Sequence, residues 1–156
     1  MKKTKLFLLA LVLLGALPAA AQQSAAASAF QNKVKNYLYN EGYAPYVDED
    51  GDLCFKKEGE LYYFTISDGN NGQPVYIEFH RVGFNATDGI ESELQETANY
   101  INQTKKCVKC VLNEKSLTFS IESLSFDAAD YVLTIPRAIN MLDGSYEDAV
   151  EHWRAL

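Results

Sequence analysis

Strict alternation of apolar and polar residues along several short stretches is the feature that most limits what this chain can fold into. A period of two sends successive side chains to opposite faces of a strand, so each stretch predicts a strand with one buried face. Asp50-Gly51 and Glu58-Gly59 separate three of these stretches, and such pairs are typical of tight hairpin turns. We therefore expect an antiparallel sheet. Its core face is predicted to carry Leu53, Phe55, Tyr62, Phe64, Ile66, Val75, Ile77, Phe79, Leu117, Phe119 and Ile121.

The sequence predicts six strands in all, and Pro45 argues that the first of them lies at an edge of the sheet, because proline lacks the N–H that an inner strand donates. The predicted strands are Tyr43–Val47, Leu53–Lys57, Leu61–Ile66, Val75–Val82, Lys106–Leu112 and Leu117–Glu122.

Three other segments have apolar residues at the spacing of amphipathic helices. Their apolar residues are Phe30, Val34, Tyr37 and Leu38 in the first, Ile90, Leu94, Ala98 and Ile101 in the second, and Tyr131, Ile135, Ile139 and Leu142 in the third. Gly42 should end the first helix, and Ser125 should cap the third. Pro136 predicts a kink or break, and Gly144 predicts a stop before a short helix capped by Ser145. The resulting order, α-β-β-β-β-α-β-β-α, with the helices on one sheet face, defines an α+β fold.

The first 21 residues have the three parts of a secretory signal peptide. Lys2, Lys3 and Lys5 form a basic start, an apolar run follows over residues 6–14, and Ala19-Ala20-Ala21 supplies the small residues of a cleavage site. The run is shorter than the ~20 residues that a membrane-spanning helix needs. We expect cleavage near Ala21, no integral membrane segment afterwards, and a periplasmic or secreted bacterial protein.

After the cleavage site, residues 22–29 form an Ala/Ser/Gln leader without an apolar stripe, which we expect to be a flexible tether. Residues 30–156 are long enough for one domain with one core. All 21 acidic residues follow the signal peptide, so the mature chain is more negative than the −7 of the whole chain. This charge disfavours nucleic acid as a partner and favours basic proteins.

Several turns and helix ends, in their order and spacing, resemble the YbjN-type family. The stretches that carry the resemblance are residues 41–45, 48–53 and 55–59, Ala98-Asn99 with Asn102 and Thr104-Lys105, and residues 135–139 with Leu142. The resemblance covers roughly residues 30–142 and implies the fold of type III secretion chaperones, small proteins that bind other polypeptides, commonly as dimers. It supplies no catalytic residues. Those chaperones act in the cytoplasm, whereas this chain carries an export signal, so the fold is expected to transfer better than the chaperone role.

The cysteines offer a redox hypothesis and a structural one. Cys107 and Cys110 form a CxxC motif, which in other proteins serves thiol–disulfide exchange or binds zinc. Here the motif falls in a predicted strand, where three extended residues separate the Cα atoms by about 10 Å, beyond the ~7 Å limit of a disulfide. Alternation puts Cys54 and Cys107 on the outer face and Cys110 in the core. We therefore expect a Cys54–Cys107 bridge if their strands are neighbours, and a redox-responsive role through the CxxC motif stays as an alternative.

Other motifs give no cofactor or metal site. The acidic stretch from Asp48 to Asp52 begins like a calcium loop, but its sixth and twelfth positions are Leu53 and Gly59 where Gly and Glu are required. No serine lies in a glycine-flanked elbow beside a histidine, and no glycine loop precedes a lysine and a helix. We expect a protein that is not an enzyme and that has no cofactor.

The outer sheet face is the predicted binding surface, because it mixes aromatic and polar groups. Its candidate binding residues are Tyr63, Tyr76, Glu78, His80 and Thr118. Such a face is solvated, bound to a partner or second copy, or used for a small ligand or an acid–base pair of Glu78 and His80. Alternatively the C-terminal segment with Trp153 covers it. We predict an exported, non-enzymatic protein-binding or chaperone-like module that is a candidate homodimer, with a periplasmic ligand-binding protein or enzyme as the alternative.

Overall fold

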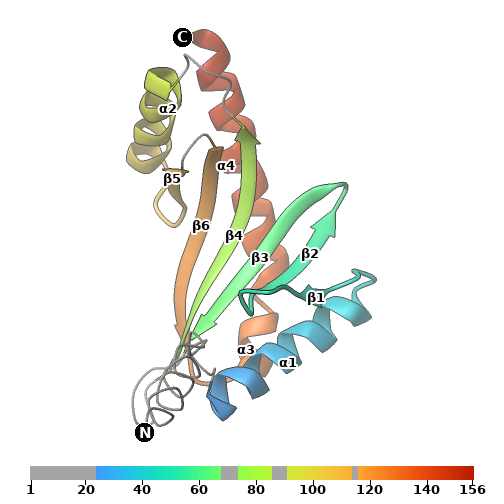
Figure 1. Cartoon of the computed structure of the whole chain (residues 1–156). Coiled ribbons are helices and arrows are strands. Elements are labelled where there is room, and N and C mark those ends of the chain that lie inside the picture. The colour runs from blue at the N-terminus through green and yellow to red at the C-terminus, as the bar shows by residue number, and fades with distance from the viewer. Residues whose placement is uncertain (1–23, 68–73, 86–90, 114–115) are drawn as a thin grey trace, which may run out of the picture.

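The computed structural model describes residues 24–67, 74–85, 91–113 and 116–156, and these form an antiparallel sheet with helices packed on it (Figure 1). The elements are α1 (Ala25–Asn40), β1 (Tyr46–Val47), β2 (Leu53–Lys57), β3 (Glu60–Ser67), β4 (Val75–Asn85), α2 (Glu91–Thr104), β5 (Lys109–Asn113), β6 (Ser116–Ser125), α3 (Ala128–Val132) and α4 (Ile135–Ala155). The strand order is β1-β2-β3-β4-β6-β5, and every pairing is antiparallel. The α+β prediction is confirmed.

The core lies between the sheet and the helices. Every residue predicted for the core face of the sheet belongs to it, with Ile121 half-buried and the others buried. All four helices contribute side chains to this cluster, among them Leu38, Leu94, Tyr131 and Leu142. Burial of such apolar side chains contributes about 1.5–3 kcal/mol each, which is why the period of two decides the fold so strongly. Because the helices share one side of the sheet, the opposite face is left for other uses.

The sheet edges and turns follow from local chemistry. β1 is a two-residue strand at the edge of the sheet, as Pro45 predicted. Gly51 has φ +90°, a left-handed conformation that glycine adopts without strain, and it joins β1 to the central hairpins. Asp48 holds the same turn, because its side chain accepts hydrogen bonds from the backbone N–H groups of Asp50 and Asp52. The acidic stretch from Asp48 to Asp52 is therefore a hairpin turn that caps itself.

The helices differ from the sequence prediction at their ends. α1 begins at Ala25, where the Ser24 side chain accepts a hydrogen bond from the Ala27 backbone, so the flexible leader predicted for residues 22–29 is wrong for residues 25–29. Ala27 is fully buried, and this packing orders the turn. Residues 22 and 23 and the predicted signal peptide lie outside the described residues. The N-cap of α3 is Asp127, and Ser125 hydrogen-bonds to the Asp127 backbone instead of capping the helix itself.

The C-terminal helix is longer than predicted. The break expected at Pro136 is confirmed, because α3 ends at Val132 and Pro136 lies in the first turn of α4. The stop expected at Gly144 is wrong, since α4 continues through it to Ala155. Ser145 caps no helix and is buried inside α4, where its hydroxyl donates to the Met141 carbonyl. Packing of Leu142 and Ala149 against the core outweighs the local preference of Gly-Ser to end a helix.

Candidate functional site

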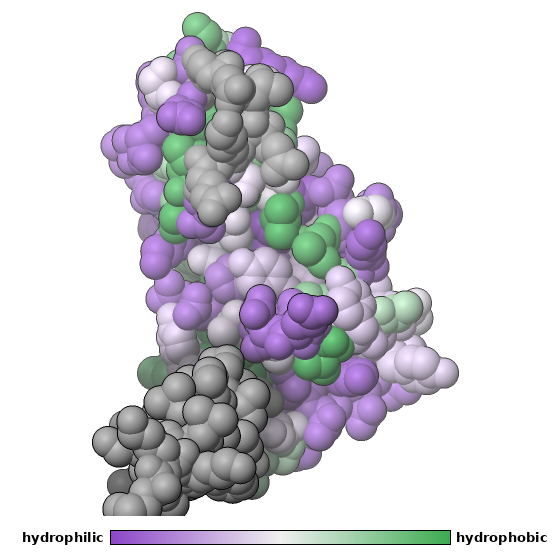
Figure 2. All heavy atoms as spheres, in the orientation of Figure 1, coloured by the Kyte–Doolittle hydropathy of each residue, from purple (hydrophilic) through white to green (hydrophobic). Residues whose placement is uncertain are grey.

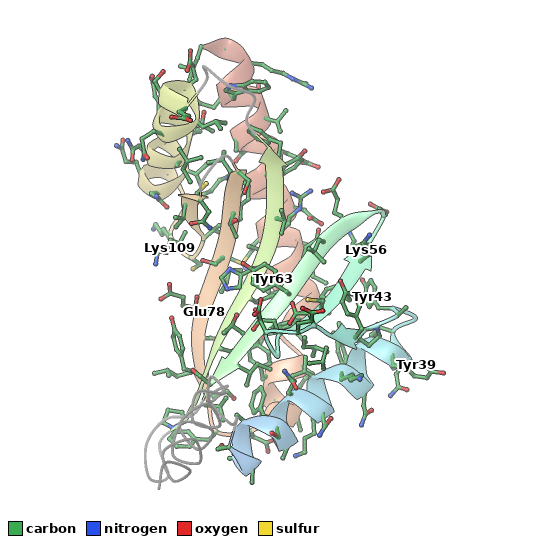
Figure 3. All side chains as sticks on the ribbon, viewed as in Figure 1. Tyr39, Tyr43, Lys56, Tyr63, Glu78 and Lys109 are labelled. Atoms are coloured by element: carbon green, nitrogen blue, oxygen red, sulfur yellow. The ribbon has the colours of Figure 1, made fainter. Side chains whose placement is uncertain are left out.

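The outer sheet face brings most of the predicted binding residues together. Tyr63 on β3 faces His80 on β4, and their rings stack with centroids 4.3 Å apart and planes 8° from parallel. The Glu78 carboxylate on the same strand lies 3.4 Å from His80 Nε2. Figure 3 shows Tyr63 and Glu78 projecting from the front of the sheet, away from α4. Thr118 is on the same face but buried, where its hydroxyl accepts a hydrogen bond from the Asn113 side chain.

One continuous row of outer-face residues crosses all six strands, because the register of each pair aligns with the next. We call this the central row, and it consists of Tyr46, Cys54, Tyr63, His80, Ser120 and Lys109. Directly opposed side chains in antiparallel pairs lie about 4.5–5.5 Å apart at Cβ, so these residues form one contiguous row, in which Cys54 and Ser120 are buried. The sequence alone could not produce this row, since it depends on β6 lying between β4 and β5.

A second row beside the central row is acidic. Glu78 and Glu122 are direct partners across β4 and β6, an arrangement in which like charges repel. Lys109 Nζ lies 3.0 Å from Glu122 and, together with a hydrogen bond from Tyr76, lowers the pKa of that carboxyl. Desolvation and the same bond to Glu122 raise the pKa of Tyr76 to about 12. Glu78 and Glu122 together thus carry more negative charge than their neighbours neutralise, and this excess suits a cationic partner.

His80 is the least satisfied group on this face. Its side chain is 12% exposed, and Nδ1 is buried without a hydrogen-bond partner in the described part of the chain. Burial lowers the pKa of His80, although Glu78 and Glu122 act in the opposite direction. The ring is therefore neutral at pH 7. With Nε2 directed at a carboxylate and bearing the proton, Nδ1 remains as an unused hydrogen-bond acceptor.

The cysteines do not behave as predicted. β2 and β5 are separated by β3, β4 and β6, about 19 Å at four strand spacings, so the condition for a Cys54–Cys107 bridge is not met. All three cysteines are free. Cys107 precedes β5 in an exposed bend and lines a groove on the helix side, so its predicted place on the outer face is wrong. The short β5 begins only at Lys109, and alternation does not extend beyond a strand.

The thiols themselves are poorly suited to exchange chemistry. Burial raises the pKa of the Cys110 thiol to about 12, as burial and a hydrogen bond to Asp48 do for Cys54. Exchange requires a thiolate, so these two sulfurs are held in the unreactive form. This geometry weakens the redox hypothesis for the CxxC motif. Within the described ranges, no three His, Cys, Asp or Glu side chains are grouped so that they could hold a metal ion.

A partly buried charged cluster around Arg81 on the helix side was missed by the sequence analysis. Arg81 Nε lies 3.0 Å from Asp143 on α4, and Lys57 Nζ lies 2.9 Å from the same carboxylate. Tyr62 also donates to Asp143, and the Arg81 guanidinium stacks 3.6 Å from the centre of the Tyr146 ring. The alternation pattern could have revealed this cluster, because Arg81 continues the core-facing series of Ile77 and Phe79. A charge at a core position requires a partner on the helix that covers it.

The C-terminal segment leaves the outer face open. Trp153 and Tyr146 contact Phe84 and Phe119 on the helix side of the sheet, so the predicted alternative in which this segment covers the binding face is wrong. Figure 1 shows α4 passing behind the strands. None of the helices in the described residues is long and apolar enough to cross a membrane.

Comparison with known proteins identifies the fold. No protein-family model matches the chain, and no curated protein matches it. A crystal structure of YbjN from E. coli, described as a candidate transcription regulator, matches with a TM-score of 0.60 at 12% sequence identity. The match covers 78% of this chain and 92% of that chain. This chain has the YbjN fold. At such low identity the likeness establishes architecture only, so the role of the YbjN fold here has to be argued from the surface of this chain.

Proposed function

We propose that this protein is an exported, non-enzymatic protein-binding module that holds its partner on the outer face of the sheet. The observation that carries the proposal is the central row, which spans all six strands on the face opposite the helices. Aromatic side chains beside polar groups that remain unsatisfied are typical of protein interfaces. Tyr63 and His80 provide the flat stacked centre of this surface.

The chemistry of the face favours a basic partner. Glu78 and Glu122 oppose each other across two strands, and Asp48 and Asp52 extend the negative charge towards β1. An arginine or lysine of a partner would relieve the repulsion between the two glutamates and donate hydrogen bonds to them. The net negative charge of the chain would steer such a partner towards it.

The same charge separates this proposal from a role on nucleic acid. The regulator description belongs to the E. coli protein, and a chain with twenty-one acidic and fourteen basic residues repels a phosphate backbone. The Glu78–His80 pair is the feature that favours the alternative of acid–base chemistry. On an open sheet face it lacks the enclosure that such chemistry uses to exclude water. We therefore place protein binding first.

The direct test is a cross-linked pull-down of the tagged chain from its own cell envelope, read by mass spectrometry. Wild type is compared with Tyr63→Ala combined with Glu78→Gln on the outer face. Tyr39→Ala is the matched control, because Tyr39 is an exposed tyrosine on α1, outside the sheet. Circular dichroism confirms that each variant is folded.

We expect one dominant protein partner with wild type and Tyr39→Ala, and its loss with the outer-face variant. Recovery of the same partner by all three chains would show that binding does not use the outer face. Recovery of no specific protein by wild type would contradict the proposal and favour the small-ligand alternative.

A further inference from the structure

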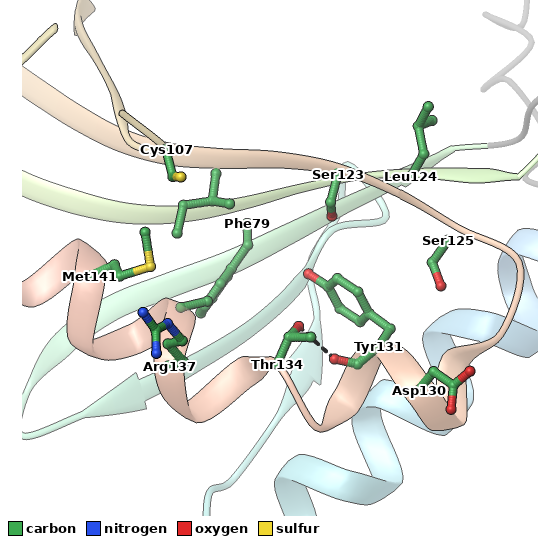
Figure 4. A pocket seen from close by; sticks show the side chains of 12 residues that line it. Phe79, Cys107, Ser123, Leu124, Ser125, Asp130, Tyr131, Thr134, Arg137 and Met141 are labelled. Carbon is green, nitrogen blue, oxygen red and sulfur yellow. Dashed lines mark hydrogen bonds between the residues drawn. The ribbon is translucent and has the colours of Figure 1, made fainter. Parts of the chain in front are cut away.

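A groove on the helix side of the sheet is lined mostly by apolar side chains. It lies between β6 and the helices α3 and α4 and has a volume of about 410 Å³, which is in the usual range for small-molecule sites (Figure 4). Its apolar walls include Phe79, Ile121, Tyr131, Ala138 and Met141. The front of the molecule, by contrast, is mostly hydrophilic (Figure 2). The groove is therefore a candidate site of its own, for a ligand with an apolar body.

Arg137 on α4 places a positive charge in this groove. Its side chain lines the groove, is exposed, and forms no ion pair or hydrogen bond with the described residues. Figure 4 shows Arg137 and Met141 at one end of the groove and Asp130 at the other. The guanidinium can therefore pair with an anion that a ligand brings, and its fork of N–H donors matches the two oxygens of a carboxylate.

The start of α4 attracts an anion to the same end of the groove. Thr134 and Arg137, which both line the groove, flank the first residues of this 21-residue helix. Thr134 is at the N-cap position but makes no capping hydrogen bond, because its hydroxyl donates to the Tyr131 carbonyl. The N–H groups of the first turn are thus left without a side-chain cap. They carry the positive end of the helix dipole, which favours a negative group beside them.

We propose that this groove binds the free anion of a long-chain carboxylic acid. The carboxylate lies at Arg137 and the first turn of α4, and the alkyl chain lies along the apolar walls. Leu124, which is 67% exposed, extends these walls along β6. Asp130 repels a second negative group at the far end, so the ligand is a monoanion that carries its charge at one end.

The attraction has to be local, because the whole chain carries a net charge of −7 and repels anions at long range. At physiological salt that repulsion is screened beyond about 8 Å, so the groups that touch the carboxylate decide the binding. The chain supplies the rest of the affinity through burial in the groove. Both contributions can be varied separately in the ligand.

The test is calorimetric titration of the purified chain with octanoate, decanoate and dodecanoate at physiological salt, below the concentrations at which they form micelles. We expect one carboxylate to bind per chain. Each added methylene should tighten binding by roughly two- to fourfold, because it buries more apolar surface. Decanol, which has the same chain length as decanoate and no charge, is the matched control ligand.

Arg137→Gln should weaken the binding of decanoate by about fivefold, the size expected for a charge pair at an exposed arginine, and should leave the binding of decanol unchanged. Arg154→Gln is the matched control variant, because Arg154 is an exposed arginine in the last turn of the same helix. Asp130→Asn removes the opposite charge from the groove and should not weaken the binding of decanoate. Circular dichroism confirms that each variant is folded.

Cys107 locates the ligand in the wild-type chain. This cysteine is exposed and lines the groove, so bound dodecanoate should slow its reaction with a maleimide severalfold. Three results would each overturn the proposal: no saturable binding of any of the carboxylates, equal weakening of decanoate by Arg137→Gln and Arg154→Gln, or binding that leaves the labelling rate of Cys107 unchanged. None of them depends on a partner at the outer face, so the two proposals can fail separately.

Discussion

At the scale of single residues, the buried positive charge of Arg81 is compensated by the carboxylate of Asp143. The Arg81 side chain is 5% exposed and Asp143 is 24% exposed, so water cannot replace the carboxylate. We predict that Asp143→Asn lowers the free energy of unfolding by roughly 2–4 kcal/mol, somewhat less than a fully buried pair. Urea unfolding measures the loss. Asp148→Asn, which breaks a more exposed pair with Lys105, is the control and should cost less than about 1 kcal/mol. Equal losses of unfolding free energy in the two variants would show that the ion pair of Arg81 with Asp143 stabilises the fold no more than an exposed pair does.

His80 gives a pH dependence whose sign follows from its environment. Burial lowers its pKa in the folded chain, so the unfolded chain takes up a proton first as the pH falls. Stability is therefore fully present above pH about 6.5, the unfolded value, and is lost as the pH falls through the folded pKa. The groups that face the ring are Glu78, Glu122, Lys109 and Tyr63.

The measurement is urea unfolding at a series of pH values between neutral and mildly acidic. His80→Gln should flatten the dependence in the window just below pH 6.5, because glutamine does not titrate. The carboxyl group of Asp143, whose pKa is lowered, acts at a more acidic pH and should be unaffected. An unchanged slope in His80→Gln would mean that another group is responsible.

At the scale of elements, two glycines show why the sequence predicted some helix and strand boundaries correctly and others wrongly. Gly51 sits at φ +90° in a turn that the sequence predicted, whereas Gly144 sits inside α4, where it was expected to stop the helix. A Cβ at Gly144 would meet nothing within 4 Å. We predict that Gly144→Ala stabilises the protein by about 0.5–1 kcal/mol. Thermal unfolding measures it, and Gly51→Ala should destabilise by about 1 kcal/mol because its backbone is left-handed. Destabilisation by Gly144→Ala would mean that α4 needs flexibility at this point.

These boundaries show what the sequence can predict. Alternation identifies the core face of the sheet because burial of Phe55 or Phe64 is decided by each strand alone. Turn chemistry identifies the hairpins for the same local reason. The strand order is set by packing between residues that are far apart in the sequence, and local patterns do not report it. The position of β6 beside β4 both creates the central row and separates Cys54 from Cys107, which is why the predicted bridge was wrong. Likewise α4 passes Gly144 because its far half packs on the core, which no local pattern reports.

At the scale of the whole molecule, export and topology make a joint prediction about the cysteines. The predicted signal peptide would deliver three cysteines to an oxidising compartment, where pairing is favoured. The sheet keeps Cys54 apart from the other two by three intervening strands, and Cys110 is buried in the core. We therefore expect that the chain recovered from the periplasm begins near Gln22 and carries no disulfide within the chain.

Intact-mass analysis after labelling with a maleimide tests both parts. In the native protein only Cys107 should react, because it is exposed while Cys54 and Cys110 are buried and their thiols have pKa values of about 12. All three should react after unfolding without reductant. Cys107→Ser is the control and should remove the native label alone. A chain that retains residues 1–21 would contradict export, and a Cys107–Cys110 disulfide would revive the redox hypothesis.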